Sequence, residues 1–255
     1  MKSLLPAVIV LALAGTCCAH PVPTVPTHVE LADDLARKTV ELVEVPDPEG
    51  DLAKCAADDV GCILAAAMEG TEPHVYCSGE WVSPTQILTA NHCMGDDPHI
   101  GDDKLFAVET DVVPGEDGVV IGHRPAKLQA RDEKHDLALL YVAGVVPAHG
   151  VATLALEDIV PGQDAFAMGA PLGLGWSFSA GTVSQIRYMD ADSGALWYVQ
   201  ATTPISPGSS GGGLYDAWGR LIGVSKATAP RGENINIFVH RDDIRAFLAA
   251  AKVGA

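Results

Sequence analysis

The chain has 255 residues, 48% of them hydrophobic, and a formal net charge of −17 at pH 7. That length can bury the core of one two-lobed domain or of two small ones. The negative charge argues against nucleic acid as a partner, because phosphates would be repelled. The 26 glycines and 17 prolines, with few aromatic residues, indicate a turn-rich, all-β protein.

Residues 1–19 have the pattern of a secretory signal peptide. Lys2 precedes an apolar run, Leu4–Ala14, and small residues lead to Ala19, after which we expect cleavage. The run is too short to span a bilayer, and no later segment is long and apolar enough to do so. We therefore expect an exported protein, secreted or periplasmic, with no membrane span.

A lipid anchor on Cys17 or Cys18 is the less favoured alternative, because Thr16 breaks the usual Leu-Ala-Gly-Cys spacing of lipoproteins. Without the signal peptide, four cysteines remain in an oxidising compartment, and this even number favours two disulfides. Zinc bound by four cysteines is less favoured, because the spacings match no known ligand pattern.

Cys55 and Cys62 present a geometric difficulty as a pair. On one unbroken helix they would lie about 10 Å apart, too far for a disulfide. If they pair, the chain must turn between them, and Asp58-Asp59-Val60-Gly61 is suitable turn material. Whether this disulfide forms stays open.

Residues 20–73 are expected to form a partly helical N-terminal extension. Leucines recur on one face of a helix predicted over Val29–Val43, and the Ala-rich segment Leu52–Met68 is expected to be helical in pieces. The favoured interpretation is an appendage packed on the main domain. A pro-segment or an inhibitory lid is the alternative, and nothing in the sequence separates them.

From His74 onward, short β runs alternate with turns in two groups, separated by a connector over Val145–Glu157. This pattern favours two packed β-barrels over βαβ units. We expect barrel 1 at about 74–143, barrel 2 at about 160–240 and a C-terminal helix over 241–252. The expected strands are Val75–Tyr76, Glu80–Val82, Gln86–Thr89, Leu105–Val108, Gly118–Ile121, Leu137–Val142, Asp164–Met168, Ser177–Gln185, Leu196–Thr202, Gly213–Tyr215, Arg220–Ser225 and Asn236–Val239.

Three polar residues stand at the edges of apolar runs. His92 ends the run ILTANH, Asp136 begins DLALL, and Ser210 lies in the glycine loop GSSGG. A serine hydroxyl is a weak nucleophile until a base removes its proton and donors hold the oxyanion that forms. At such edges, packing can hold a base, its orienting carboxylate and a nucleophile in place.

The order His, Asp, Ser, with the motifs LTANHC, HDLALL and PGSSGG, resembles the chymotrypsin-like (trypsin-like) serine proteases. The second half is similar to the bacterial HtrA (Deg) branch: FAMGAPLGLGWSFSAGTVSQI resembles the loop before its nucleophile strand, and VQATTPISPGSSGGGLYDAWGRLIGV its nucleophile segment. The resemblance covers about Tyr76–Leu248, and the PDZ module usual in that branch is not expected. A disulfide between Cys77 and Cys93 would resemble that of trypsin-type members and would clamp the strand carrying His92.

The resemblance implies two packed six-stranded antiparallel barrels, with residues 74–255 as the protease domain. It implies an endopeptidase that acts on proteins or peptides through an acyl-enzyme, without cofactor or metal. Ser210 would attack the peptide carbonyl, His92 would take and return the proton, and Asp136 would hold the imidazole tautomer. The backbone N–H groups of Gly208 and Ser210 would form the oxyanion hole.

The sequence departs from the family in ways that affect activation and specificity. Ser209 stands where trypsin-type zymogens carry an Asp that pairs with a new N-terminus, so such activation is not expected. Pro204 stands where trypsin-like specificity pockets carry an Asp, so a buried cation would find no partner. The opposite wall would be Ser225-Lys226-Ala227, with Lys226 either lining it or pointing outward. We expect a small or medium apolar residue before the scissile bond.

Two other interpretations are less favoured. GSSGG also fits the nucleophile elbow of α/β-hydrolases, but Gly211-Gly212-Gly213 is a poor helix start and that fold places its histidine last. A protease-like secreted binding or inhibitory protein without activity is the more serious rival, and the complete set of three residues argues against it. The other histidines show no metal-ligand spacing. The oligomeric state and the natural substrate stay open.

Overall fold

The structure, a computed structural model, describes residues 24–44, 74–94, 106–109, 123–143, 150–191, 194–229 and 232–253. Several predictions fall outside these ranges: the signal peptide, the lipid-anchor cysteines, the Cys55–Cys62 disulfide and the strand expected over Gly118–Ile121. Within the described ranges, no helix has the length and apolar character needed to cross a membrane.

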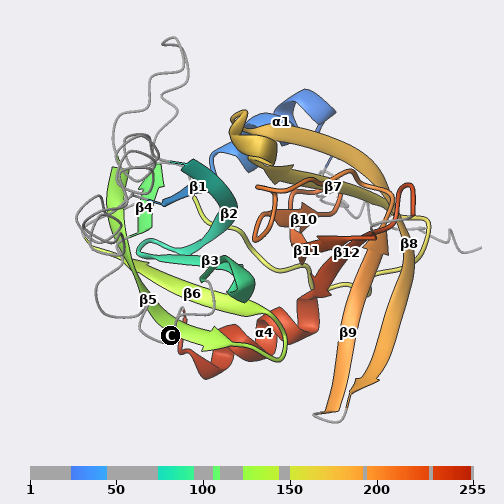
Figure 1. Ribbon diagram of the computed structural model, residues 1–255. Helices are drawn as coiled ribbons and strands as arrows, with labels where there is room; N and C mark the ends of the chain where they lie inside the picture. The colour runs from blue at the N-terminus through green and yellow to red at the C-terminus, as the bar shows by residue number, and fades with distance from the viewer. Residues whose placement is uncertain are drawn as a thin grey trace, which may run out of the picture.

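The described residues form two closed antiparallel barrels of six strands each, which lie side by side (Figure 1). This confirms the predicted all-β, chymotrypsin-like fold class. The first barrel has the strand order β1-β2-β3-β6-β5-β4 and the second β10-β11-β12-β9-β8-β7. Their bounds are β1 Thr39–Glu44, β2 His74–Ser83, β3 Gln86–Ala90, β4 Phe106–Glu109, β5 His123–Asp132, β6 Leu137–Val142, β7 Asp164–Gly169, β8 Ser177–Ala191, β9 Gly194–Ala201, β10 Gly213–Tyr215, β11 Leu221–Thr228 and β12 Asn236–His240.

The first barrel begins earlier in the chain than predicted. In place of one helix over Val29–Val43, α1 spans His28–Ala36 and β1 follows it. Because β1 pairs with β2 and with β4, it closes the barrel. The start predicted for barrel 1, at residue 74, is therefore wrong. β1 is part of the barrel and not an appendage packed on it. Polar and apolar residues alternate over Thr39–Leu42, which suits a strand, and pairing with β2 selects the strand over the helix that the leucine spacing predicts.

The sequence does not predict the strand β5, because HRPAKLQARD is largely polar and contains a proline. Alternation is nevertheless present, since Ala126 is fully buried and Lys127 is exposed. A strand with one solvated face carries only this weak signal. β5 pairs with β6 and β4, so it completes the barrel beside the turn that carries Asp136.

The helix α1 has a complete N-terminal cap and a buried face. The Thr27 hydroxyl accepts the Glu30 N–H, and the Glu30 carboxylate accepts the Thr27 N–H, which satisfies two otherwise unpaired donors. Leu31 and Leu35 are buried against residues of both barrels. The helix is therefore part of the core of the domain.

Within the described residues, one hydrophobic cluster fills each barrel and a third lies between the barrels. Strands β3 and β6 have two buried faces: Ile87 and Leu140 point into barrel 1, whereas Leu88 and Leu139 join the cluster between the barrels. This explains why their sequences read as continuous apolar runs rather than alternating ones. The strands that flank the candidate site are thus held on both sides.

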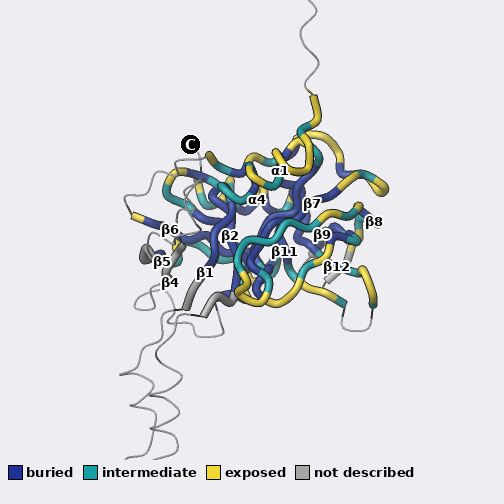
Figure 2. Tube along the Cα trace, turned by 90° about the horizontal axis from the view of Figure 1, so that it is seen from above, coloured by how far each residue is buried: buried dark blue, intermediate teal, exposed yellow. Residues whose placement is uncertain are grey.

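The predicted C-terminal helix is confirmed as α4 (Arg241–Ala250). Its side chains Ile244 and Phe247 join the cluster between the barrels, and Figure 1 shows α4 running from barrel 2 beneath β6. Figure 2 shows the buried residues concentrated along the central strands β2, β7 and β11, with exposed residues at the periphery. The glycine loop that precedes β10 and the turn before β6 both attach to this buried framework.

Candidate active site

His92 lies in a short 3-10 helix, η1 (Asn91–Met94), directly after the buried strand β3. Met94 and Cys93 are buried, and Cys93 forms a disulfide with Cys77 of β2, as the resemblance implied. The backbone around His92 is thus fixed from two sides, while its imidazole stays 44% exposed.

Asp136 is the last residue of the turn that leads into β6 and is 6% exposed. It adopts a left-handed backbone conformation, with φ 61°, which Asp tolerates better than most side chains. Its carbonyl accepts the Asn91 N–H at 3.1 Å, so the turn is tied to η1. This backbone arrangement places the Asp136 carboxylate next to His92, which follows Asn91.

The imidazole of His92 and the carboxylate of Asp136 are in direct contact. Nδ1 lies 3.0 Å from Oδ2 and 3.2 Å from Oδ1, and the His92 backbone N–H donates to Oδ1 at 2.9 Å. Burial raises the pKa of Asp136, but the hydrogen bonds and charges of His92 and Lys226 outweigh burial, so this pKa lies below its usual value. The carboxylate is therefore ionised at neutral pH and can orient the imidazole.

Ser210 lies in the loop between β9 and β10, and two glycines allow the loop to take its shape. Gly208 has φ +95° and Gly211 has φ +84°, a region that favours glycine. A Cβ on Gly208 would collide with the Ala170 carbonyl, and one on Gly211 would collide with the Thr89 hydroxyl. The loop is thus packed closely against its neighbours in both barrels.

One residue of barrel 1 anchors this loop. The Ser78 backbone N–H donates to the Ser210 carbonyl at 2.7 Å, and the Ser78 hydroxyl donates to the Gly208 carbonyl at 2.7 Å. The same hydroxyl accepts the Ala170 N–H at 2.9 Å. No sequence signal identified Ser78, because its partners lie far away along the chain.

The Ser210 carbonyl lies 3.7 Å from Cys93 Sγ, which places Ser210 beside the residue that follows His92. Among the described residues, no hydrogen bond joins the Ser210 hydroxyl to His92, whereas His92 and Asp136 are bonded. Nor do the N–H groups of Gly208 and Ser210 donate to any described protein acceptor.

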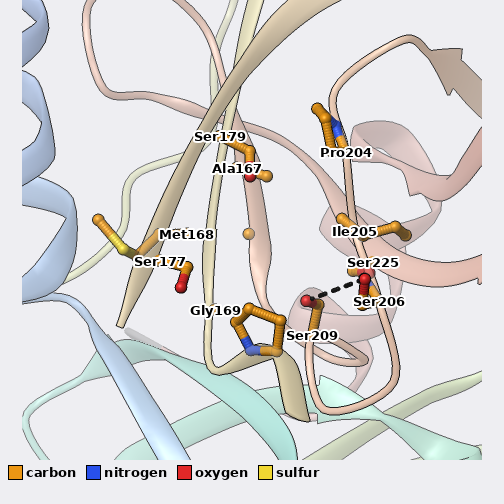
Figure 3. A pocket seen from close by; sticks show the side chains of 12 residues that line it. Ala167, Met168, Gly169, Ser177, Ser179, Pro204, Ile205, Ser206, Ser209 and Ser225 are labelled. Atoms are coloured by element: carbon orange, nitrogen blue, oxygen red, sulfur yellow. Dashed lines mark hydrogen bonds between the residues drawn. The ribbon is translucent and has the colours of Figure 1, made fainter. Parts of the chain in front are cut away.

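The four residues expected to line a specificity pocket are only partly brought together. Pro204 and Ser225 line a cavity of about 80 Å³ behind Ser209 (Figure 3). Ala227 is exposed, and Lys226 instead donates to Asp136 Oδ2 at 2.7 Å. The lining residues are Ala167, Met168, Gly169, Pro171, Ser177, Ser179, Pro204, Ile205, Ser206, Ser209, Gly213 and Ser225, so none is acidic.

One group of potential metal ligands occurs among the described residues, formed by Cys77, His92 and Cys93 within 4.8 Å of one another. Its two sulfurs are joined in the disulfide and offer no thiolate. The group is therefore unsuited to a metal ion.

Residues 77–224, more than half of the chain, match the family described as "Trypsin-like peptidase domain". Among curated proteins, the chain is 31% identical over 134 residues to a probable periplasmic serine endoprotease, DegP-like, of Halomonas elongata, a match covering 49% of this chain and 27% of that protein. It is 32% identical over 114 residues to the periplasmic pH-dependent serine endoprotease DegQ of Escherichia coli, covering 44% and 25% respectively. The match thus spans only about a quarter of the length of these relatives.

Solved structures share the fold at low identity. The Rv3671c protease of M. tuberculosis H37Rv, in an inactive form, superposes with a TM-score of 0.62 at 15% identity, covering 92% of this chain and 100% of that chain. The serine endoprotease from Yersinia pestis superposes with a TM-score of 0.59 at 20% identity, covering 89% and 68%. The sequence matches confirm the predicted resemblance to the HtrA (Deg) branch, and the chain belongs to the trypsin-like peptidase domain family.

Proposed function

We propose that this protein is an exported serine endopeptidase that hydrolyses peptide bonds through an acyl-enzyme on Ser210. The observation that carries the proposal is the bonded pair His92–Asp136 next to a loop that presents Ser210 beside Cys93. Membership of the trypsin-like peptidase domain family supports the same assignment.

The hydrogen bonds favour one tautomer of His92. With Nδ1–H donated to the ionised Asp136, Nε2 carries a lone pair and acts as the base for the Ser210 hydroxyl. Ser210 Oγ then bonds to the peptide carbonyl carbon while its proton moves to Nε2. The proton next passes to the leaving amine, and water repeats the sequence to release the acid and restore Ser210.

The negative oxygen of the tetrahedral intermediate accepts hydrogen bonds from the N–H groups of Gly208 and Ser210. Such donors act strongly because they are already oriented, and removing one such donor typically lowers kcat by about 10²–10³-fold. The positive φ of Gly208 supports this role, since it turns the peptide unit in a way that other residues resist.

The proposed substrates are proteins or peptides with a small or medium apolar residue before the scissile bond. Pro204 and the other residues lining the nearby cavity include no carboxylate to pair with a lysine or arginine. Export is supported by the N-terminal pattern, by the Cys77–Cys93 disulfide, which is typical of an oxidising compartment, and by the periplasmic names of the relatives.

The test is labelling of the purified protein with a fluorophosphonate probe, which forms a covalent adduct with an activated serine. We expect labelling of the wild type, with the adduct located on Ser210 by mass spectrometry, and none of Ser210→Ala. Ser184→Ala, at an exposed position on β8, is the matched control and should label like the wild type. An unlabelled wild type, or equal labelling of Ser210→Ala, would contradict the proposal.

A further inference from the structure

A lysine from barrel 2 contacts the carboxylate that orients the proposed base. Lys226 of β11 donates to Asp136 Oδ2 at 2.7 Å, and its side chain is 27% exposed. Asp136 itself belongs to barrel 1, so this ion pair crosses between the barrels. Because the carboxylate is almost fully buried, the pair is screened less than a surface ion pair.

The donors around Asp136 divide between its two oxygens. Oδ1 accepts the backbone N–H of His92 at 2.9 Å, whereas Oδ2 lies 3.0 Å from the imidazole Nδ1 and 2.7 Å from the ammonium of Lys226. The neighbouring Ser225 hydroxyl is buried and has no partner among the described residues. The β11 donor to this carboxylate is therefore the charged side chain of Lys226.

We propose that Lys226 is a positioning residue of the triad, which holds the Asp136 carboxylate against the imidazole and makes protonation of His92 harder. The proposal rests on the proposed function of Ser210, His92 and Asp136. Lys226 acts through Asp136, since its ammonium is already bonded to that carboxylate.

The electrostatic effect follows from a shared partner. Because Oδ2 contacts both groups, the ammonium nitrogen and Nδ1 are at most about 6 Å apart. Two positive charges at that separation repel each other enough to shift a protonation midpoint by about 0.5 pH units in a water-like dielectric and about 2 units at an effective dielectric constant of about 20. Loss of Lys226 should therefore move the acidic limb of the activity profile to higher pH.

Other titratable groups lie near this site on the packed elements. Tyr198 of β9 has its ring centroid 6.0 Å from the Lys226 ammonium, and burial, then the charges of Asp136 and Asp243, raise the pKa of its phenol. On the turn before β6, His135 pairs with Asp132 at 2.7 Å. His135 also lies 4.0 Å from Asp243 of α4, and Arg131 of β5 contacts Asn91 and Glu133.

The experiment measures the rate of fluorophosphonate labelling between about pH 4.5 and about pH 9 for the wild type and for Lys226→Met. We expect the acidic midpoint to rise by about 0.5–2 pH units in Lys226→Met and to stay near the wild-type value in Lys226→Arg, which keeps the charge. Lys127→Met, on the exposed face of β5, is the matched control for loss of a lysine and should leave the midpoint unchanged.

A folded Lys226→Met whose profile superposes on that of the wild type would overturn the inference while leaving the proposed function intact. A wild type that is not labelled would instead refute the proposed function. A lower plateau rate without a shifted midpoint would also count against the inference, because any structural damage lowers the plateau. If the methionine variant does not fold, Lys226→Gln replaces it.

If Lys226→Met folds but labels too slowly to measure, the imidazole of His92 can be titrated directly by NMR in a Ser210→Ala background. Two proteins are compared, Ser210→Ala alone and Ser210→Ala combined with Lys226→Met. We expect the midpoint of His92 to be higher in the combined variant by the same about 0.5–2 pH units. Equal midpoints would overturn the inference.

Discussion

The buried carboxyl of Glu80 is expected to make the protein less stable as the pH rises from 4.5 to about 8. Glu80 lies on β2, is fully buried, and accepts the Gly213 N–H at 2.6 Å and a hydrogen bond from the Tyr215 hydroxyl. The Thr39 hydroxyl lies 3.1 Å from both carboxyl oxygens. Burial raises the pKa of Glu80 to about 8, although these hydrogen bonds and Lys38 oppose the change.

The size of the effect follows from the difference between the two pKa values. In the unfolded chain Glu80 should ionise near its ordinary value of 4.5, whereas in the folded protein it keeps its proton to about pH 8. Below pH 4.5 both states are protonated, so stability does not depend on this group. Between the two values the unfolded state has released a proton that the native state holds, so stability falls by up to about 5 kcal/mol and levels off once the folded protein also ionises.

The assay is urea unfolding between about pH 5 and about pH 9 of Ser210→Ala, chosen to prevent self-cleavage, with and without Glu80→Gln. Because Gln does not ionise, the stability of the Glu80 protein minus that of the Glu80→Gln protein should fall by about 4 kcal/mol across this range, while other titrating groups cancel. Glu133→Gln, at an exposed glutamate, is the control and should give a nearly constant difference. A constant difference for Glu80→Gln would refute the reasoning.

Three further variants test other parts of the structure. Asp136→Asn should keep the fold, because Asn also tolerates a left-handed φ. It should lower kcat on a peptide substrate by up to about 10⁴-fold. A kcat within about tenfold of the wild type would contradict the proposed role of the carboxylate in orienting the imidazole. Replacing Cys77 and Cys93 together by serine should lower the free energy of unfolding in urea by about 3 kcal/mol, and an unchanged midpoint would contradict a role for the bridge. Gly211→Ala should destabilise by more than about 2 kcal/mol in the same assay, because its Cβ would meet the backbone of β2; wild-type stability would show that the loop can adjust.

Local patterns in the sequence predict much of this architecture. His92 and Asp136 each stand at the end of an apolar run, and the structure shows why: β3 and β6 pair along their whole length, so their ends meet. The glycine loop is recognisable because its backbone needs residues without side chains. These features depend on contiguous residues.

The features that the sequence does not predict depend on contacts between distant segments. Nothing local marks Glu80, since its partners come from β1 and β10, and nothing local directs Lys226 toward Asp136. The helix predicted through β1 is wrong because the leucine spacing of α1 continues into the strand, and only pairing with β2 decides the matter. Sequence periodicity cannot report which strands will become neighbours.

The bonds that Ser78 makes to the loop carrying Ser210 bear on when the proposed activity first appears. Barrel 1 supplies His92, Asp136 and the anchor Ser78, whereas barrel 2 supplies Ser210, so neither barrel alone contains the whole site. In the proposed function, catalytic competence therefore requires both barrels to be packed together. A chain exported before it folds would, on this proposal, stay harmless to its own cell until both barrels are in place.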